Sequence, residues 1–238
     1  MKMRARRMLP ILLLGLVFAA GAGCVALGGR DTSYHPQIDP ADFGATVDNP
    51  YFPLAPGTTL KYVEKSGGET TESEITVTPD TKVVMGVTCV AVRERVKENG
   101  ALKDETYDWY AQDKQGTVWH FGTAAKEFKS GGRVNTEGSW EAGIKGAQPG
   151  IIMPANPKPG KPYRHQYAPE EAEDMAQIVA VDDSITVPYG TFKGCVRTKE
   201  WSLLEAGHEI KWYAKDVGLV RTEATGGEVS VLVSMTRP

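Results

Sequence analysis

The chain contains four histidines, the residues best suited to act as metal ligands or general bases near neutral pH. No two of them lie at a spacing typical of metal ligands, and the motifs HExxH, CxxC, GxSxG, GxGxxG and the P-loop do not occur. His120, within GTVWHFG, is the best single candidate for a ligand-binding side chain or a base; the alternative is a hydrogen-bonded structural histidine. The sequence therefore gives no catalytic residue by motif.

A second group of residues that could do chemistry is acidic. Pro169 is followed by EEAEDMAQ, which predicts a short helix near 170–177, with proline at its first position and carboxylates in its first turn. The alternative is a cation held by these carboxylates and the preceding histidine, because hard cations prefer oxygen ligands. The candidate metal ligands are His165, Glu170, Glu171, Glu173 and Asp174.

The segment 138–176 contains the connection GIIMPANP, which is unusually apolar for a loop. We expect this connection to fold back over the strands like a lid, and any ligand pocket to lie beneath it. The candidate ligand-binding residues are Trp140, Ile152 and Met153, together with His120.

Two cysteines lie beyond the N-terminal region, Cys89 and Cys195. In an oxidising compartment they could form a disulfide, provided that their α-carbons come within about 7 Å. They could equally be two small buried side chains. Both interpretations remain open at the level of sequence.

The elements that must position these residues form an internal repeat. Trp109-Tyr110-Ala111 recurs 103 residues later as Trp212-Tyr213-Ala214, and four other features recur in the same order at nearly the same offset. Two related units, 53–123 and 156–224, are therefore predicted, with a joining segment at 124–155. The recurring features are Pro56-Gly57 with Pro159-Gly160, a glycine turn leading into Cys89 or Cys195, a glycine hairpin at Asn99-Gly100 or Ala206-Gly207, the aromatic strand, and Gly116 with Gly218.

Each unit reads as short strands separated by glycine and asparagine turns, without a competing helical period. The predicted fold class is all-β, a duplicated antiparallel β-meander that forms a sandwich or an open barrel, with one domain over 51–238. Strand alternation places Trp109 and Trp212 in the core. It places Asp108, Tyr110, Lys211 and Tyr213 on a solvent-exposed face.

The N-terminus has the features of an export signal: basic residues, a continuous apolar run and small residues over 1–23. The sequence Gly21-Ala22-Gly23-Cys24 resembles a bacterial lipobox, so Cys24 is the predicted lipid attachment site and 24–50 a flexible tether. Ordinary cleavage, giving a secreted or periplasmic protein, is the alternative. Val25 gives no acidic retention signal, so the outer membrane is the expected location if the cell has two membranes.

Removal of residues 1–23 takes away four basic residues and no acidic ones, so the net charge changes from −3 to −7. An acidic chain of this kind is not suited to neutralising phosphates, so nucleic acid is not an expected partner. No motif indicates a cofactor.

Three stretches carry a resemblance to known proteins: DNPYFPLAPGTTLKYV, YDWYAQDKQGTVWHFG, and EGSWEAG with GIIMPANP and YRHQYAPEEAEDMA. They resemble a family of uncharacterised exported bacterial proteins of lipoprotein type. The resemblance covers most of the exported chain and implies an exported, β-rich fold. It implies no activity or site residue.

These observations favour a non-catalytic exported envelope protein, held at the membrane by a lipid, that binds a small apolar ligand or an envelope component. One alternative is a secreted hydrolase with its site under the 138–176 segment. A histidine bonded there to a carboxylate and a hydroxyl would favour it. The other alternative is a carboxylate-rich metal-binding protein.

Overall fold

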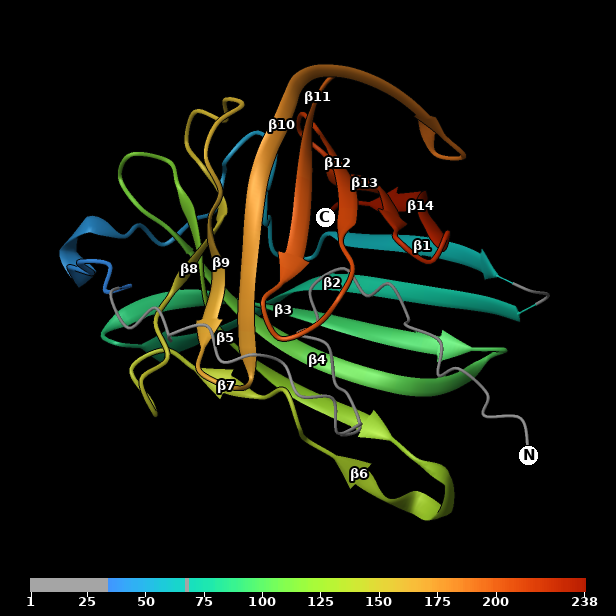
Figure 1. The fold of residues 1–238 in the computed structure, drawn as a ribbon, viewed down its shortest axis with the longest axis horizontal. Coiled ribbons are helices and arrows are strands. Elements are labelled where there is room, and N and C mark those ends of the chain that lie inside the picture. Colours follow the sequence, from blue (N-terminus) through green and yellow to red (C-terminus); the bar gives the residue numbers. More distant parts are fainter. Residues whose placement is uncertain (1–33, 67–68) are drawn as a thin grey trace.

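A computed structural model describes residues 34–66 and 69–238. The predicted signal sequence and Cys24 lie outside the described residues. The predicted all-β class is confirmed: 14 antiparallel strands form one strongly curled sheet, which is not closed into a barrel (Figure 1). No helix in these two ranges is long and apolar enough to cross a membrane.

Eight strands lie between residues 59 and 153, and six lie between residues 163 and 236. The first eight are β1 (Thr59–Ser66), β2 (Glu69–Val84), β3 (Val87–Glu98), β4 (Ala101–Gln112), β5 (Val118–Phe128), β6 (Val134–Asn135), β7 (Trp140–Glu141) and β8 (Gly150–Met153). The last six are β9 (Tyr163–Ala168), β10 (Ala172–Val187), β11 (Gly190–Ser202), β12 (Glu209–Ala214), β13 (Gly218–Ala224) and β14 (Val229–Thr236). Two short 3₁₀ turns, η1 (Pro40–Asp42) and η2 (Ser130–Gly132), complete the assigned elements of the described chain.

The order of strands in the sheet repeats itself. Strands β5 to β1 lie side by side, then β14, then β13 to β9, and the two long strands β2 and β10 have 16 residues each. Strand β14 bridges the two runs by pairing with both β1 and β13. The two runs also approach each other at their far ends, between β5 and β9. There β7 and β8 pair with β5, and Gln148 forms an isolated bridge with Tyr167 of β9. The segment 124–155, predicted as a join, therefore supplies β7 and β8 in the place that β14 fills in the second half.

The hydrogen-bond register of the two halves also matches. Val90 pairs with Tyr110 as Val196 pairs with Tyr213, and the register shifts between Trp109 and Tyr110 as it does between Trp212 and Tyr213. A shared register with a shared irregularity supports the predicted repeat, because unrelated hairpins have no reason to shift at the same residue pair. Figure 1 shows the two groups of strands, teal to green and orange to red, inclined steeply to each other.

The predicted helix near 170–177 is wrong. Glu170 adopts a φ of 68° in a turn, and Ala172 begins the 16-residue strand β10. Ala172, Ala176 and Ile178 are buried, and Asp174 pairs with both Gln166 of β9 and Ser202 of β11. Sheet pairing on both sides outweighs the local helical signal of EEAEDMAQ.

The predicted solvent-exposed face is also wrong. Trp109 and Trp212 are buried, as expected, but Asp108, Tyr110, Lys211 and Tyr213 are buried as well, at 0–4% exposure. Both faces of these strands are covered because the sheet curls on itself and segments outside the repeat pack on its outer side. Trp109 packs with Phe121 and Trp140 in one apolar cluster, whereas Tyr110 and Tyr213 belong to another inside the curl.

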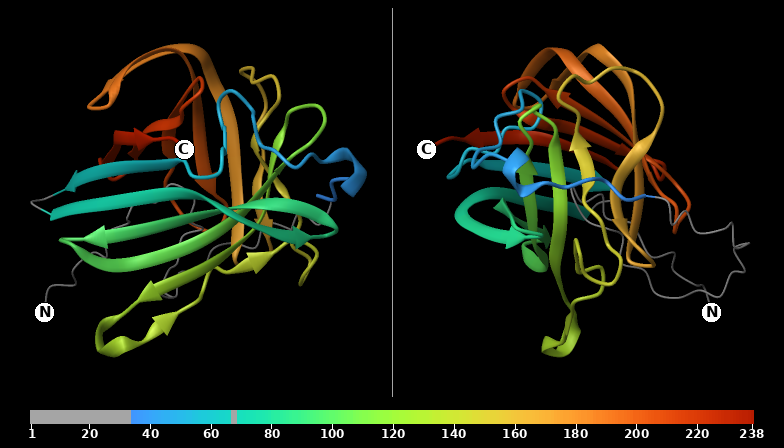
Figure 2. Two further views of the ribbon diagram at one scale, coloured as in Figure 1. Left: turned by 180° about the vertical axis from the view of Figure 1, so that it is seen from behind. Right: turned by 90° about the vertical axis from the view of Figure 1, so that its left-hand side faces the viewer.

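The residues before β1 form a strap, defined as 47–56, that ties the two halves together (Figure 2). Its buried Asn49 donates from Nδ2 to Gly116 O at 2.8 Å in the first half, and Pro50 O accepts from Asp216 N at 2.7 Å in the second. The described part of the predicted tether is held at several points: the Tyr34 hydroxyl donates to Pro149 O, and Val47 and Asn49 are buried.

Candidate functional site: the polar interior of the curled sheet

Glu200 is the centre of a buried ion-pair network in the second half. Its Oε2 lies 2.7 Å from Lys211 Nζ, and its Oε1 accepts from the hydroxyls of Thr198 at 2.7 Å and Tyr213 at 3.0 Å. Lys211 also lies 2.9 Å from Glu209 Oε2. Burial opposes the charge of Glu200, but Lys211, with smaller contributions from His165 and the Thr198 hydroxyl, outweighs it and lowers the pKa of Glu200 to about 2. The network is therefore ionised throughout the neutral range.

His165, on β9, faces this network without closing it. Its Nε2 lies 3.9 Å from Glu200 Oε2, too far for a hydrogen bond. Burial lowers the pKa of His165 to about 4, so the imidazole is neutral at pH 7. Asp174 reaches the same region, and burial raises its pKa to about 6.

The first half contains a different polar group. Asp108 Oδ1 accepts from Thr123 Oγ1 at 2.6 Å and lies 3.2 Å from His120 Nε2. His120 Nε2 is also 2.9 Å from the carbonyl oxygen of Gly122, which can only accept, so this nitrogen carries a hydrogen. The His120 ring stacks on Tyr110 at 4.7 Å and meets Trp140 edge-on.

This arrangement is not a nucleophile–base relay. In a relay the hydroxyl lies on one imidazole nitrogen and the carboxylate on the other, so that a proton can move from hydroxyl to ring. Here Thr123 and Asp108 both lie at Nε2 of His120, and the Thr123 hydroxyl donates to the carboxylate. All three side chains are buried. A histidine, a carboxylate and a hydroxyl therefore lie together, as in a hydrolase. Because both partners lie at the same ring nitrogen, the contacts orient the imidazole of His120 but do not relay a proton from Thr123.

Several buried polar atoms of the interior have no hydrogen-bond partner within the described chain. They include Tyr110 Oη, His120 Nδ1, Tyr163 Oη, His165 Nε2 and Thr222 Oγ1. A buried polar group without a partner costs about 1–3 kcal/mol, so such groups normally face water or a ligand. Glu200 helps to raise the pKa of both Tyr110 and Tyr163, after burial, which places both side chains near the same carboxylate.

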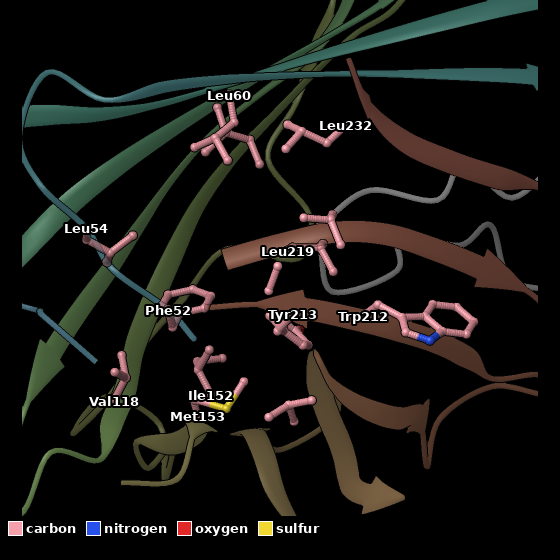
Figure 3. Close-up of a cluster of buried hydrophobic side chains, with 14 of the residues drawn as sticks. Phe52, Leu54, Leu60, Val118, Ile152, Met153, Trp212, Tyr213, Leu219 and Leu232 are labelled. Carbon is pink, nitrogen blue, oxygen red and sulfur yellow. The ribbon is translucent and has the colours of Figure 1, made fainter. Parts of the chain in front are cut away.

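Figure 3 shows an apolar cluster inside the curl, and two of its members, Tyr110 and Tyr213, also belong to the polar groups described above. Phe52 of the strap projects into the curl, and its ring lies 5.3 Å from Tyr110 and 6.5 Å from Tyr213. A pocket of about 40 Å³ lies beside it, lined in part by Leu54, Leu60 and Leu219. Figure 3 shows Ile152 and Met153 on the other side of Phe52, whereas the Trp212 indole points away from this group.

The residues predicted to bind a ligand or metal are thus only partly brought together. Ile152 and Met153 are core residues of strand β8, in the wall of the sheet, so the predicted lid is wrong. His120 and Trp140 touch each other. Glu170 lies exposed in a turn, away from buried His165, and no three His, Cys, Asp or Glu side chains of the described ranges are placed to hold a metal ion.

Cys89 and Cys195 are both free and buried, so the disulfide that the sequence allowed is not formed. They occupy matching strands but pack in the two separate apolar clusters. Burial raises the pKa of the Cys89 thiol to about 12 and also raises that of Cys195, which makes both thiols unreactive in the folded protein.

Sequence reasoning missed the Glu200–Lys211 network. The signal that could have found it is the repeat: Glu200 lies four residues after Val196 and Glu94 four residues after Val90, and both glutamates are buried. A carboxylate retained at one inward position of both units marks an interior that is not purely apolar.

Comparison of the chain with known protein families, with curated proteins and with solved structures gives no match.

Proposed function

We propose that this protein is an exported, non-catalytic binding protein that holds a small amphipathic ligand inside the curled sheet. One observation supports this proposal above the others: buried polar atoms without partners within the described residues adjoin an apolar cluster in the same interior. The apolar part of the ligand contacts Phe52, Leu60 and Leu219, and its polar part contacts the network around Glu200. Small-molecule sites are typically apolar for the most part, with a few convergent polar groups.

The strap is the part that admits the ligand. The pocket of about 40 Å³ has room for about one water molecule or methyl group, so a longer chain requires Phe52 and Leu54 to move. The strap is a connection without strand pairing over most of its length, and such segments open at lower free energy than the strands they cover.

Export and anchoring belong to the same proposal. The basic and apolar residues of 1–23 and the lipobox-like Cys24 support attachment of the domain to a membrane through a lipid, facing the cell envelope. Mass spectrometry of the N-terminal peptide from its own cell tests this part. An acyl mass on Cys24 is expected, and an unmodified Cys24 or a chain that still carries residues 1–23 contradicts it.

The ligand itself is sought by extracting the protein, purified from its own cell, with organic solvent after denaturation. We expect one class of amphipathic small molecule in near-stoichiometric amount. The variant Phe52→Trp fills the pocket and is expected to lose the ligand, whereas Val134→Trp, at an exposed position, retains it. Equal recovery from both variants, or no recovery from the unaltered protein, argues against an interior site.

The hydrolase alternative is not proposed, because the geometry at His120 does not form a relay.

A further inference from the structure

The carboxylates around Lys211 outnumber the cations that face them. Lys211 lies within 3 Å of both Glu200 and Glu209. Asp174 and Glu64 also lie close enough to Glu209 for its charge to raise their pKa values, after burial. Burial, with the charges of Glu228 and Glu209, raises the pKa of Glu64 to about 7. Burial raises the pKa of Asp174 to about 6, although Ser202 and Lys211 lower it. A second positive charge would therefore be stabilised in this part of the interior.

A gap of defined size separates two acceptors in the cluster. Glu200 Oε2 has one donor, Lys211, and lies 3.9 Å from the unpaired Nε2 of the neutral His165, which is 6% exposed. In the neutral tautomer that carries its hydrogen on Nδ1, His165 Nε2 is an acceptor, and one nitrogen donor at a hydrogen-bond distance of about 2.9 Å from each atom can bridge it to Glu200 Oε2. Two further hydroxyls without a partner among the described residues, those of Tyr110 and Tyr163, lie in the same region.

We propose that the carboxylates around Lys211, together with His165, bind the protonated amine head group of the ligand. The ammonium would lie between Glu200 and His165. This inference rests on the proposed function, because it assigns the polar end of the ligand held by the apolar cluster. An anionic head group would meet Glu200, Glu209 and Asp174 in a site with little access to water, where like charges repel strongly. A neutral hydroxyl head group could bridge the same two acceptors but would not neutralise the negative charge of the carboxylates around Lys211.

The chemistry is tested with three probes that share one alkyl chain: decylammonium, decanol and decanoate. Binding of each to the full-length protein is measured by calorimetry at pH 7 and below the micelle concentration. Because hydrogen bonds to charged groups are stronger than those between neutral groups, decylammonium is expected to bind at least about tenfold more tightly than decanol. Decanoate is expected to bind most weakly.

Two variants locate the head group. His165→Met removes one bridging acceptor and is expected to reduce the affinity for decylammonium about tenfold, while the affinity for decanoate changes little. His208→Met is the matched control in an exposed turn and should change neither. If His165→Met does not fold, Tyr110→Phe supplies the test, because its hydroxyl has no partner among the described residues whose loss would destabilise the protein.

The outcomes separate this inference from the proposed function. Equal affinity for all three probes, or a preference for decanoate, overturns the amine assignment and leaves an interior amphiphile site. Failure of all three probes to bind overturns both. If only an ordered water bridges Glu200 and His165, the three probes should bind with equal affinity. The affinities of His165→Met should then equal those of the unaltered protein, and the amine assignment is overturned.

Discussion

Replacement of Lys211 by methionine gives the most direct test of the polar interior. Lys211 is 4% exposed, and its Nζ lies 2.7 Å from Glu200 and 2.9 Å from Glu209. Without the lysine, Glu200 keeps its charge and its two hydroxyl donors but loses the cation that offsets its burial. Breaking a buried pair in this way costs about 3–5 kcal/mol of the free energy of unfolding.

Urea unfolding of the full chain at pH 7 measures this cost, and two further variants control it. Lys61→Met removes a pair at 3.2 Å whose side chains are 57% and 38% exposed, and should cost less than about 1 kcal/mol. In Lys211→Met with Glu200→Gln, the glutamine oxygen still accepts from Thr198 and Tyr213. The double variant should therefore recover most of the lost stability, which gives a coupling energy of about 2–3 kcal/mol.

The pH dependence provides a second readout. In the unaltered protein the pKa of Glu200 is lowered to about 2, so its ionisation stabilises the fold above pH 4.5 and this contribution is lost as the pH falls toward 2. In Lys211→Met the cation that lowers this pKa is gone, so the difference from the unaltered protein should be greatest at neutral pH and shrink as Glu200 takes up a proton. If Lys211→Met costs no more than Lys61→Met at pH 7, the buried network is refuted.

Three further predictions concern other parts of the molecule. Gly150→Ala should lower the free energy of unfolding by more than about 2 kcal/mol, because its Cβ would overlap with the carbonyl oxygen of His165. Urea unfolding is the test, with Gly44→Ala as the control because no atom lies within 4 Å of its Cβ; equal stability of the two variants would contradict the close contact of β8 with β9. Cys89 and Cys195 should react with a thiol reagent only as fast as the protein unfolds, whereas rapid labelling under native conditions would show that they are accessible. His165 should titrate by NMR near pH 4, and because its folded pKa is lowered, its contribution to stability is full above about pH 6.5 and lost as the pH falls to about 4; a shift near pH 6.5 would place the ring in solvent.

The repeat was the part of the fold that could be predicted from the sequence, because its aromatic strand recurs intact. The exact register between the two units of the repeat could not be predicted from the sequence. Gly116 and Gly218 recur 102 residues apart, but the structure pairs Thr123 with Asp108 and Thr222 with Lys211, an offset of 99. The first hairpin is longer, and a turn can change length without changing the strands that it joins.

The failures have a common physical cause, which is that burial depends on what covers a strand. Alternation along β4 correctly separates Trp109 from Tyr110, but it assigns one face to solvent because a single strand gives no sign that its sheet curls. The helix at 170–177 failed for the same reason: EEAEDMAQ has local helical character, and only pairing with β9 and β11 makes it a strand. For the same reason, alternation places Asp108 and Lys211 at the surface, although both are buried.

The position of β14 between the two halves bears on how the protein folds. Strand β1 pairs with β14 through contacts such as Thr59 with Thr236, which lie at opposite ends of the described chain. Until residues 229–236 have been synthesised and docked, β1 and β13 each present an unpaired edge, and such edges readily pair with other chains. Folding is therefore expected to be slow, and the chain prone to aggregation, until β14 pairs with both β1 and β13.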